Sequence, residues 1–351
     1  MTPRRRILPI FVPHAGCPND CVFCNQKRIS GSLLPASAET VRAAVAALTP
    51  GSGYELAFYG GSFTAIPESE QEALLSACIP ARESGAVASL RVSTRPDAVT
   101  PEKLDRLRRY GVETVELGAQ SMCDDVLLCS GRGHTAADTV RAARLVKDAG
   151  FSHILQMMTG LPGSDEERDM KTARAVAALR PDGVRIYPTV IIRDTSLEDL
   201  WRAGQYREHT VEDAVRICAR ILPVFENAGI PVIRLGLNPS DELSGGAAVG
   251  GAYHPALGEL VRSRLWRDRA ERLLTGVPAG ADVSLAVAAN RISVMTGQRR
   301  CNLSYLQERF ALASLHVCAA DVPDGEIIIK LQNRTNSSII NCFDAIERQG
   351  E

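Results

Sequence analysis

From residue 7 to about residue 236 the chain alternates between short apolar segments and longer amphipathic segments, and this alternation constrains the fold more than any other feature. The apolar segments lie at 7–13, 54–59, 90–94, 114–118, 153–158, 184–187 and 231–235. Short strands separated by helices of about 10 to 15 residues are typical of βαβ units in a parallel sheet. Six such units predict an α/β fold, a partial (β/α)6 TIM-type barrel, in preference to a closed barrel of eight units.

The composition is that of a globular chain with balanced charge. The 351 residues are 45% apolar and 23% charged, which allows a sizeable core in one large domain or two ordinary ones. A formal net charge of −1 gives no overall basic field that would indicate nucleic-acid binding. Two arginine-rich stretches, 4–6 and 262–269, are candidates for a local basic patch, although a solvated helix face is the commoner explanation.

The N-terminal residues resemble a signal peptide only superficially. The apolar run after the first arginines is short, contains Pro9 and Pro13, and has no small-residue cleavage site. No stretch approaches the ~20 apolar residues of a membrane span. Ten cysteines without a disulfide framework fit a reducing compartment. We therefore expect a cytoplasmic protein with no membrane partner.

The regular alternation of apolar and amphipathic segments ends before Asn238, and the sequence beyond it has a different pattern. We expect the barrel and its cysteine loop over residues 1–237, and a smaller α+β extension over 238–351 that covers the open side of the barrel. The small residues at 244–252 predict a flexible linker, and a charged helix is expected near 255–275. A β-hairpin is predicted with Asp324-Gly325 at its turn.

Three cysteines, Cys17, Cys21 and Cys24, directly follow the first predicted strand with the spacing C-x3-C-x2-C. Three thiolates on one loop can ligate three irons of a [4Fe–4S] cluster and leave the fourth iron without a protein ligand. A cluster for electron transfer alone usually has four cysteines, so an open iron indicates a further ligand. The alternatives are a zinc site, which would need a fourth ligand such as His14, a redox site, or a disulfide, which the reducing compartment disfavours.

Polar or glycine-rich motifs follow the carboxyl ends of the predicted strands, where barrels of this kind carry their chemistry. The candidate cofactor-binding residues at this edge are Gly60, Gly61, Ser62, Ser93, Arg95, Gln120, Arg132, Gln156 and Tyr187. Consecutive glycines let a ligand approach the backbone, and a guanidinium binds a carboxylate through two hydrogen bonds. The competing interpretations are plain turns, helix N-caps and, for Tyr187, packing. His134 is interpreted as a helix-start residue, and no catalytic side chain is assigned.

The cysteine spacing, followed one helix later by Gly60-Gly61, resembles the radical S-adenosylmethionine (radical SAM) superfamily. In that superfamily the open iron chelates the amino and carboxylate groups of SAM, and the glycine motif holds the SAM amino group. One electron then cleaves SAM to a 5′-deoxyadenosyl radical. The resemblance implies a [4Fe–4S] cluster on the three cysteines, SAM over the barrel mouth, and an electron donor such as flavodoxin or ferredoxin.

Further segments resemble the radical SAM domain of the Elongator catalytic subunit, in the same order along the chain. They are 116–121, 130–135, 147–151, 157–162, 167–169, 180–189, 192–195 and 200–206, and the resemblance covers roughly residues 7–237. In that family the barrel works beside an acetyl-CoA-using domain to modify the wobble uridine of tRNA. Two departures are evident: the cysteine spacing is shorter than in Elongator, and no acetyltransferase domain is recognisable after the match.

We therefore expect a radical SAM enzyme whose radical abstracts hydrogen from a substrate above the barrel mouth. The family resemblance favours tRNA as the substrate. One alternative is a small-molecule substrate, as in tetrapyrrole or cofactor synthesis. A second alternative, from a different class, is a non-catalytic iron–sulfur or zinc module that senses redox state or holds a partner.

Overall fold

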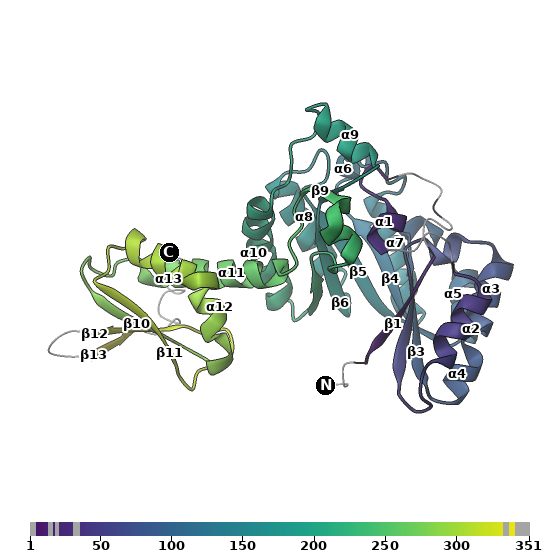
Figure 1. Cartoon of the computed structure of the whole chain (residues 1–351), viewed down its shortest axis with the longest axis horizontal. Helices are drawn as coiled ribbons and strands as arrows, with labels where there is room; N and C mark the ends of the chain where they lie inside the picture. Colours follow the sequence, from purple (N-terminus) through teal and green to yellow (C-terminus); the bar gives the residue numbers. More distant parts are fainter. Residues whose placement is uncertain (1–4, 13–16, 18–20, 31–35, 333–336, 341–351) are drawn as a thin grey trace. The chain divides into compact units, whose positions relative to one another are not determined.

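The computed structural model describes residues 5–12, 17, 21–30, 36–332 and 337–340 (Figure 1). The chain divides into two compact units, which are Met1–Ile217 with Ile221–Pro255, and Cys218–Arg220 with Ala256–Glu351. No helix in the described ranges is both long enough and apolar enough to cross a membrane.

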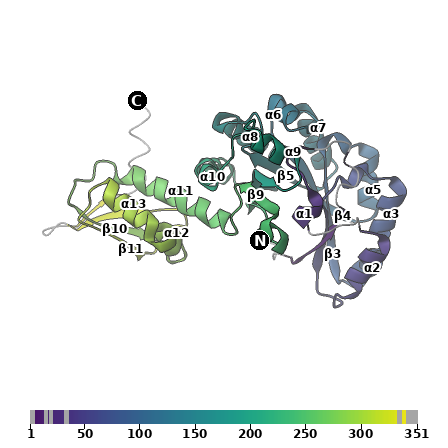
Figure 2. The same ribbon diagram turned by 45° about the horizontal axis from the view of Figure 1, so that its top comes forward.

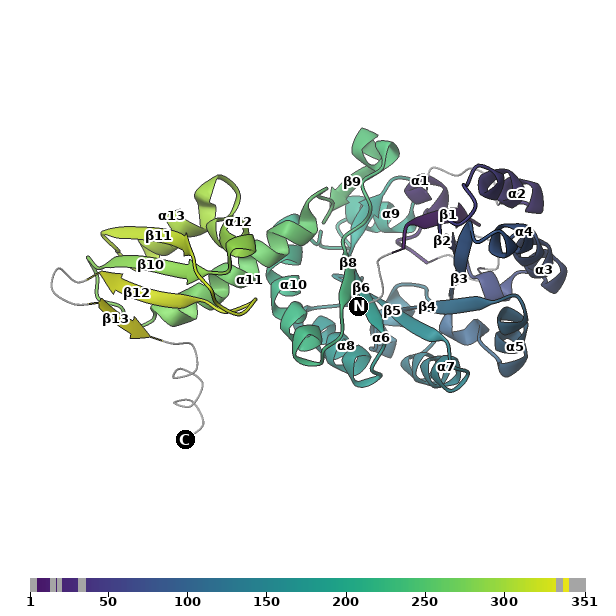
Figure 3. The same ribbon diagram turned by 90° about the horizontal axis from the view of Figure 1, so that it is seen from below.

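The larger unit is built on a parallel sheet of seven strands in the order β1-β2-β3-β4-β5-β6-β8. The strands are β1 (Ile7–Phe11), β2 (Tyr54–Tyr59), β3 (Val87–Thr94), β4 (Val112–Gln120), β5 (Ser152–Thr159), β6 (Gly183–Pro188) and β8 (Val232–Leu235). The sheet is curved, and helices cover its convex side (Figure 3). The predicted α/β fold with a partial TIM-type barrel is therefore confirmed.

The helices of this unit connect successive strands. They are α1 (Gln26–Ser30), α2 (Ala38–Ala46), α3 (Glu68–Ser76), α4 (Ile79–Glu83), α5 (Pro101–Arg109), α6 (Asp124–Cys129), α7 (Ala136–Asp148), α8 (Glu166–Ala178), α9 (Ser196–Arg202) and α10 (Val211–Asn227). Their starts follow local sequence signals. At the start of α7, Thr135 accepts the N–H of Asp138, whose carboxylate accepts the Thr135 N–H in return. Such capping boxes satisfy backbone donors that the first helical turn leaves open.

The core of the barrel lies between the sheet and its helices. Neighbouring residues in register, such as Leu56 with Leu90 and Phe58 with Val92, are completely buried. Because side chains alternate along a strand, the residues between them face the concave side of the sheet. Ala57 and Arg91 form one such in-register pair. The two faces of the sheet therefore differ: one is apolar and packed, and the other carries polar side chains.

A short antiparallel ribbon joins β7 (Val190–Ile192) to β9 (Ala248–Gly251), next to a π-helical turn at Leu243–Ala247. The prediction of a flexible linker at 244–252 was wrong. The small residues serve close backbone contact instead, because a Cβ atom on Gly251 would lie 2.8 Å from the Thr189 carbonyl oxygen. The backbone of Gly251 also has a φ of 81°, which favours glycine.

The smaller unit packs three helices against one face of a four-stranded sheet in the order β11-β10-β12-β13 (Figure 2). Its elements are α11 (Leu257–Leu274), β10 (Asp282–Val287), α12 (Ile292–Thr296), α13 (Cys301–Arg309), β11 (Ser314–Ala319), β12 (Ile328–Gln332) and β13 (Ser337–Ile340). Helix α11 confirms the charged helix expected near 255–275. The predicted hairpin at Asp324-Gly325 was wrong, because β11 and β12 pair with opposite edges of β10.

Candidate active site

The three cysteines that follow β1 lie near enough to interact electrostatically and are partly shielded from water. Cys21 is buried, and Cys17 and Cys24 are half-buried. Burial, together with the neighbouring Cys21 thiol, raises the pKa of Cys17 above its ordinary value and raises the pKa of Cys24 to about 12. The N–H of Cys24 donates to the Cys21 carbonyl at 3.0 Å, which folds this part of the loop into a tight turn.

Arg132 ties the cysteine loop to the carboxyl end of β4. Its Nη1 lies 3.4 Å from the Sγ of Cys21, and its Nη2 donates to the Gly118 carbonyl at 2.6 Å. The Arg132 carbonyl in turn accepts from Arg95 Nη2 at 2.6 Å. A cation is therefore held beside a thiol by contacts with two strand ends.

The glycine motif after β2 lies next to the same loop. Gly60 has a φ of 94°, so the chain turns here in a conformation that favours glycine. The backbone of Ser62 hydrogen-bonds the Cys17 thiol. The Ser62 hydroxyl is 3.0 Å from the Thr94 hydroxyl and accepts the N–H of Arg95. The hydrogen bonds of Ser62 are therefore made within the protein, and they connect the cysteine loop to the end of β3.

Of the buried polar atoms near this loop that have no partner in the described part of the chain, two belong to sequence-predicted cofactor-binding residues. They are Nη1 of Arg95, whose other nitrogens bind Asp97 and Arg132, and Oε1 of Gln120. Gln120 ends β4 with a φ of 63°, which is rare for a residue other than glycine. Buried polar atoms without partners are costly, so these two atoms fit a site that receives a polar ligand.

The donor chemistry of the loop fits a thiolate-bound iron–sulfur cluster. Three adjacent thiols are available, and metal binding would remove the protons that burial otherwise retains. In the ranges that the structure describes, no three His, Cys, Asp or Glu side chains are placed as a metal site, so the fit rests on donor chemistry. His14, the alternative zinc ligand, lies outside the described residues.

A second group of polar side chains lies on the concave face of the sheet, around Glu116. This carboxylate is completely buried and accepts from Arg91 Nη1 at 2.5 Å and from Arg185 Nη2 at 2.8 Å. Burial raises its pKa, but the two guanidinium groups outweigh burial, so the pKa of Glu116 is lowered. Arg91 also binds both oxygens of Glu55. We call these four residues the Glu116 network.

Three of the sequence-predicted residues lie at this network and not at the cysteine loop. Gln156 donates to Glu116 at 3.0 Å, and the Tyr187 hydroxyl is 3.5 Å from Arg185 Nη1. Ser93 is in register with Glu116 on the neighbouring strand. Sequence reasoning missed the network itself. The available signal was a charged residue inside each of four largely apolar strands, namely β2, β3, β4 and β6, of which β4 carries two.

The loop after β5 is held from both sides. The Gly160 N–H donates to Asp169 at 3.0 Å, and the Tyr206 hydroxyl donates to the Gly160 carbonyl at 2.7 Å. Burial raises the pKa of Asp169 to about 6 and lowers that of His209 to about 4. These residues line a cavity of about 340 Å³ beside the 160–166 segment. The loop is therefore rigidly supported where it reaches the barrel mouth.

Comparison of the sequence with known protein families gives matches that agree with the fold and with the cysteine loop. Residues 11–176 match the Radical SAM superfamily, and residues 181–267 match the Radical_SAM C-terminal domain. The two matches together span most of the chain. The chain therefore belongs to the radical SAM superfamily, whose members are enzymes, and the resemblance on which the prediction rested is confirmed.

Within that superfamily the chain is homologous to the radical SAM region of Elongator complex protein 3. It is 31% identical to the tRNA uridine(34) acetyltransferase of Methanocaldococcus jannaschii, over 48% of this chain and 35% of that protein. It is 32% identical to Elongator complex protein 3 of Mus musculus, over 48% of this chain and 34% of that protein. The chain thus spans about a third of the length of these relatives.

The fold is shared with a solved structure of the same group. The archaeal Methanocaldococcus infernus Elp3, with residues 1–46 deleted, superposes with a TM-score of 0.59 and 20% sequence identity. The superposition covers 97% of this chain and 76% of that chain. At this identity the likeness supports the fold alone.

Proposed function

We propose that the chain binds a [4Fe–4S] cluster through Cys17, Cys21 and Cys24 and uses it to cleave SAM, with tRNA as the substrate. When bound, the cluster supplies one electron to SAM, which yields the 5′-deoxyadenosyl radical that abstracts hydrogen from the substrate. The observation that carries the proposal is the contact of Arg132 with Cys21, because it links the cysteine loop to the carboxyl end of the sheet.

The residues around the loop have distinct roles in this proposal. Arg132 places positive charge beside a thiolate ligand and orients the loop through the Gly118 carbonyl. Arg95 and Gln120 each offer a buried polar atom without a described partner, one a donor and one an acceptor. A zwitterionic ligand such as the methionine moiety of SAM can use both. The backbone at Gly60 and Gly61 supplies close approach without side-chain obstruction.

The tRNA part of the proposal is supported by the relatives. One relative is named tRNA uridine(34) acetyltransferase, and another is named Elongator complex protein 3. The chain spans only about a third of their length. The proposal therefore covers only the radical step at the barrel. It does not cover any step performed by the other two thirds of those proteins.

The cofactor part is tested by metal analysis of the full chain purified without oxygen. About four irons and four acid-labile sulfides per chain are expected in the wild type. Cys24→Ala is expected to lose most of this content, whereas Cys318→Ala, at an exposed cysteine of β11, is expected to retain it. One zinc per chain with no sulfide would contradict the proposal and favour the non-catalytic zinc module.

The substrate part is tested by filter binding of bulk tRNA at two salt concentrations. An affinity that falls steeply with salt is expected, because phosphate contacts release counterions. An affinity that does not change with salt, or no binding, would contradict tRNA as the substrate. A small-molecule substrate would then be the better hypothesis for the same barrel mouth.

A further inference from the structure

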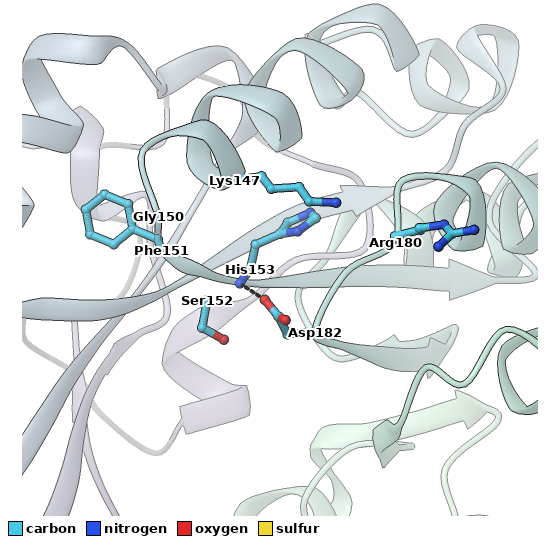
Figure 4. A pocket seen from close by; sticks show the side chains of 7 residues that line it. All are labelled: Lys147, Gly150, Phe151, Ser152, His153, Arg180 and Asp182. Atoms are coloured by element: carbon cyan, nitrogen blue, oxygen red, sulfur yellow. Dashed lines mark hydrogen bonds between the residues drawn. The ribbon is translucent and has the colours of Figure 1, made fainter.

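A second pocket lies at the amino-terminal edge of the sheet, at the opposite ends of the strands from the cysteine loop. It has a volume of about 390 Å³ and is formed by the turns that precede β5 and β6 (Figure 4). Its lining residues are Lys147, Gly150, Phe151, Ser152, His153, Arg180 and Asp182. Two of the segments that resemble Elongator, 147–151 and 180–189, meet here.

Two cations line the pocket, and neither forms an ion pair with another described residue. Lys147 and Arg180 are both exposed, and in the described ranges neither has a carboxylate within 4 Å. The carboxylate that lines the pocket, Asp182, accepts the N–H of His153 at 2.8 Å, and its own N–H donates to the His153 carbonyl at 2.9 Å. These two hydrogen bonds use Asp182 to join the turn before β6 to β5.

The buried imidazole in the wall of the pocket is the second observation that points to a ligand. His153 is only 1% exposed, and its Nε2 has no hydrogen-bond partner among the described residues. Burial, with a smaller contribution from Lys147, lowers the pKa of His153 to about 4, although Asp182 acts in the opposite direction. The ring is therefore neutral at pH 7. Figure 4 shows it beside the side chain of Lys147.

The backbone of Arg180 gives a third, independent observation. Arg180 is the second residue after the last turn of α8 and has a φ of 49°, in the left-handed region that L residues rarely adopt. The corresponding position after α7 is Gly150, with a φ of 79°. Glycine is the usual residue at such helix ends. Arginine at this position places a long cationic side chain at the pocket, at a cost in backbone strain that glycine would avoid.

We propose that this pocket binds a tetrahedral oxyanion of the phosphate type, held by Lys147 and Arg180 against the wall that contains His153. Guanidinium and ammonium groups are the usual protein partners of phosphate. The phosphate can come from a phosphodiester of an RNA strand, or from free phosphate or a phosphomonoester. This inference is independent of the proposed SAM chemistry, since it uses no residue of the cysteine loop.

The test is a calorimetric titration of the full chain with inorganic phosphate, in chloride buffer at pH 7. Wild type is expected to bind saturably, and Lys147→Gln/Arg180→Gly is expected to bind at least tenfold more weakly. Glycine adopts this backbone conformation without strain, so Arg180→Gly should melt at a temperature no lower than wild type. The matched control is Lys171→Gln/Arg174→Gln, which removes two exposed charges from α8 outside the pocket and should leave binding within twofold.

Absence of phosphate binding in wild type, or equal weakening in both double variants, would overturn the proposal. A second titration with a fluorescent single-stranded RNA distinguishes the two sources. If an RNA phosphodiester is the ligand, the pocket variant binds RNA more weakly than the control variant and with a smaller salt dependence. If phosphate binding is lost while RNA binding is unchanged, the site takes a free phosphate or a phosphomonoester.

Discussion

Arg132 holds its guanidinium 3.4 Å from the Sγ of Cys21 while it binds the carbonyl of Gly118 at the end of β4. The same residue therefore fixes the position of the cysteine loop and sets the charge beside one of its thiols. The candidate iron ligands are thereby coupled to the wall of the barrel.

The first prediction concerns this contact. Arg132→Gln removes the charge beside Cys21, and we expect SAM cleavage to slow by about tenfold, which corresponds to about 1.4 kcal/mol of activation free energy. The reduction potential of the cluster is expected to become more negative, because a nearby cation favours the reduced form. Arg144→Gln, at an exposed position of α7, is the control. An unchanged potential would show that Arg132 only supports the structure.

The second prediction concerns the Glu116 network. Glu116→Gln leaves Arg185 buried without its counterion and Arg91 with Glu55 alone, so we expect a loss of about 3 kcal/mol in the free energy of unfolding. Glu113 lies on the same strand, pairs with Arg5 and has a half-exposed side chain. Glu113→Gln is expected to cost less than about 1 kcal/mol. Urea denaturation measures both, and equal losses would contradict the importance of the network.

The third prediction concerns the loop after β5. A Cβ atom on Gly160 would collide with the imidazole of His209, and the backbone there has a φ of 70°. Gly160→Ala is expected to lower the melting temperature strongly. Gly204 has the same φ as Gly160, but a Cβ atom there would meet open space. Gly204→Ala should therefore lower the free energy of unfolding only by the ~1–2 kcal/mol of backbone strain. A similar loss in both variants would show that the contact with His209 is unimportant.

The fourth prediction is a pH dependence of stability. Burial lowers the pKa of His209 to about 4, although Asp213 acts in the opposite direction. In the unfolded chain the pKa of a histidine is about 6.5. The folded pKa is depressed, so the stability contributed by neutral His209 is present above pH 6.5 and is lost as the pH falls towards 4. We expect His209→Gln to remove about 3 kcal/mol of the acid-induced destabilisation between pH 7 and pH 4.

The measurement is the unfolding free energy of wild type and His209→Gln at several pH values between 4 and 7. His254→Gln is the control, at a histidine that is half-buried and not in this loop. This control separates the loss of the buried His209 imidazole from the loss of any histidine. Parallel curves for wild type and His209→Gln would contradict the buried, neutral state of this imidazole.

The barrel could be predicted from the sequence because its strands and helices are specified locally. Alternating periodicity and capping pairs such as Thr135 with Asp138 mark many of its elements, and parallel strands that follow one another usually pair in order. The hairpin at Asp324-Gly325 failed for the opposite reason. A turn signal specifies a bend, and Gly325 does have a φ of 103°, but it does not specify which strand lies next to which.

The functional residues could be predicted only where the signal is local. The spacing of Cys17, Cys21 and Cys24 is visible in eight residues of sequence. The Glu116 network joins charges that are up to 130 residues apart, and only the register of the strands brings them together. Similarly, nothing in the sequence shows that Arg180 adopts a left-handed backbone beside His153.

The most direct test of the radical SAM proposal is the formation of 5′-deoxyadenosine. The full chain is reconstituted with iron and sulfide without oxygen, then given dithionite and SAM, with and without bulk tRNA, and the nucleoside is measured by chromatography. We predict that wild type and Cys318→Ala form 5′-deoxyadenosine and that Cys24→Ala does not. If fully loaded wild type forms none under either condition, the proposal that this chain cleaves SAM is contradicted.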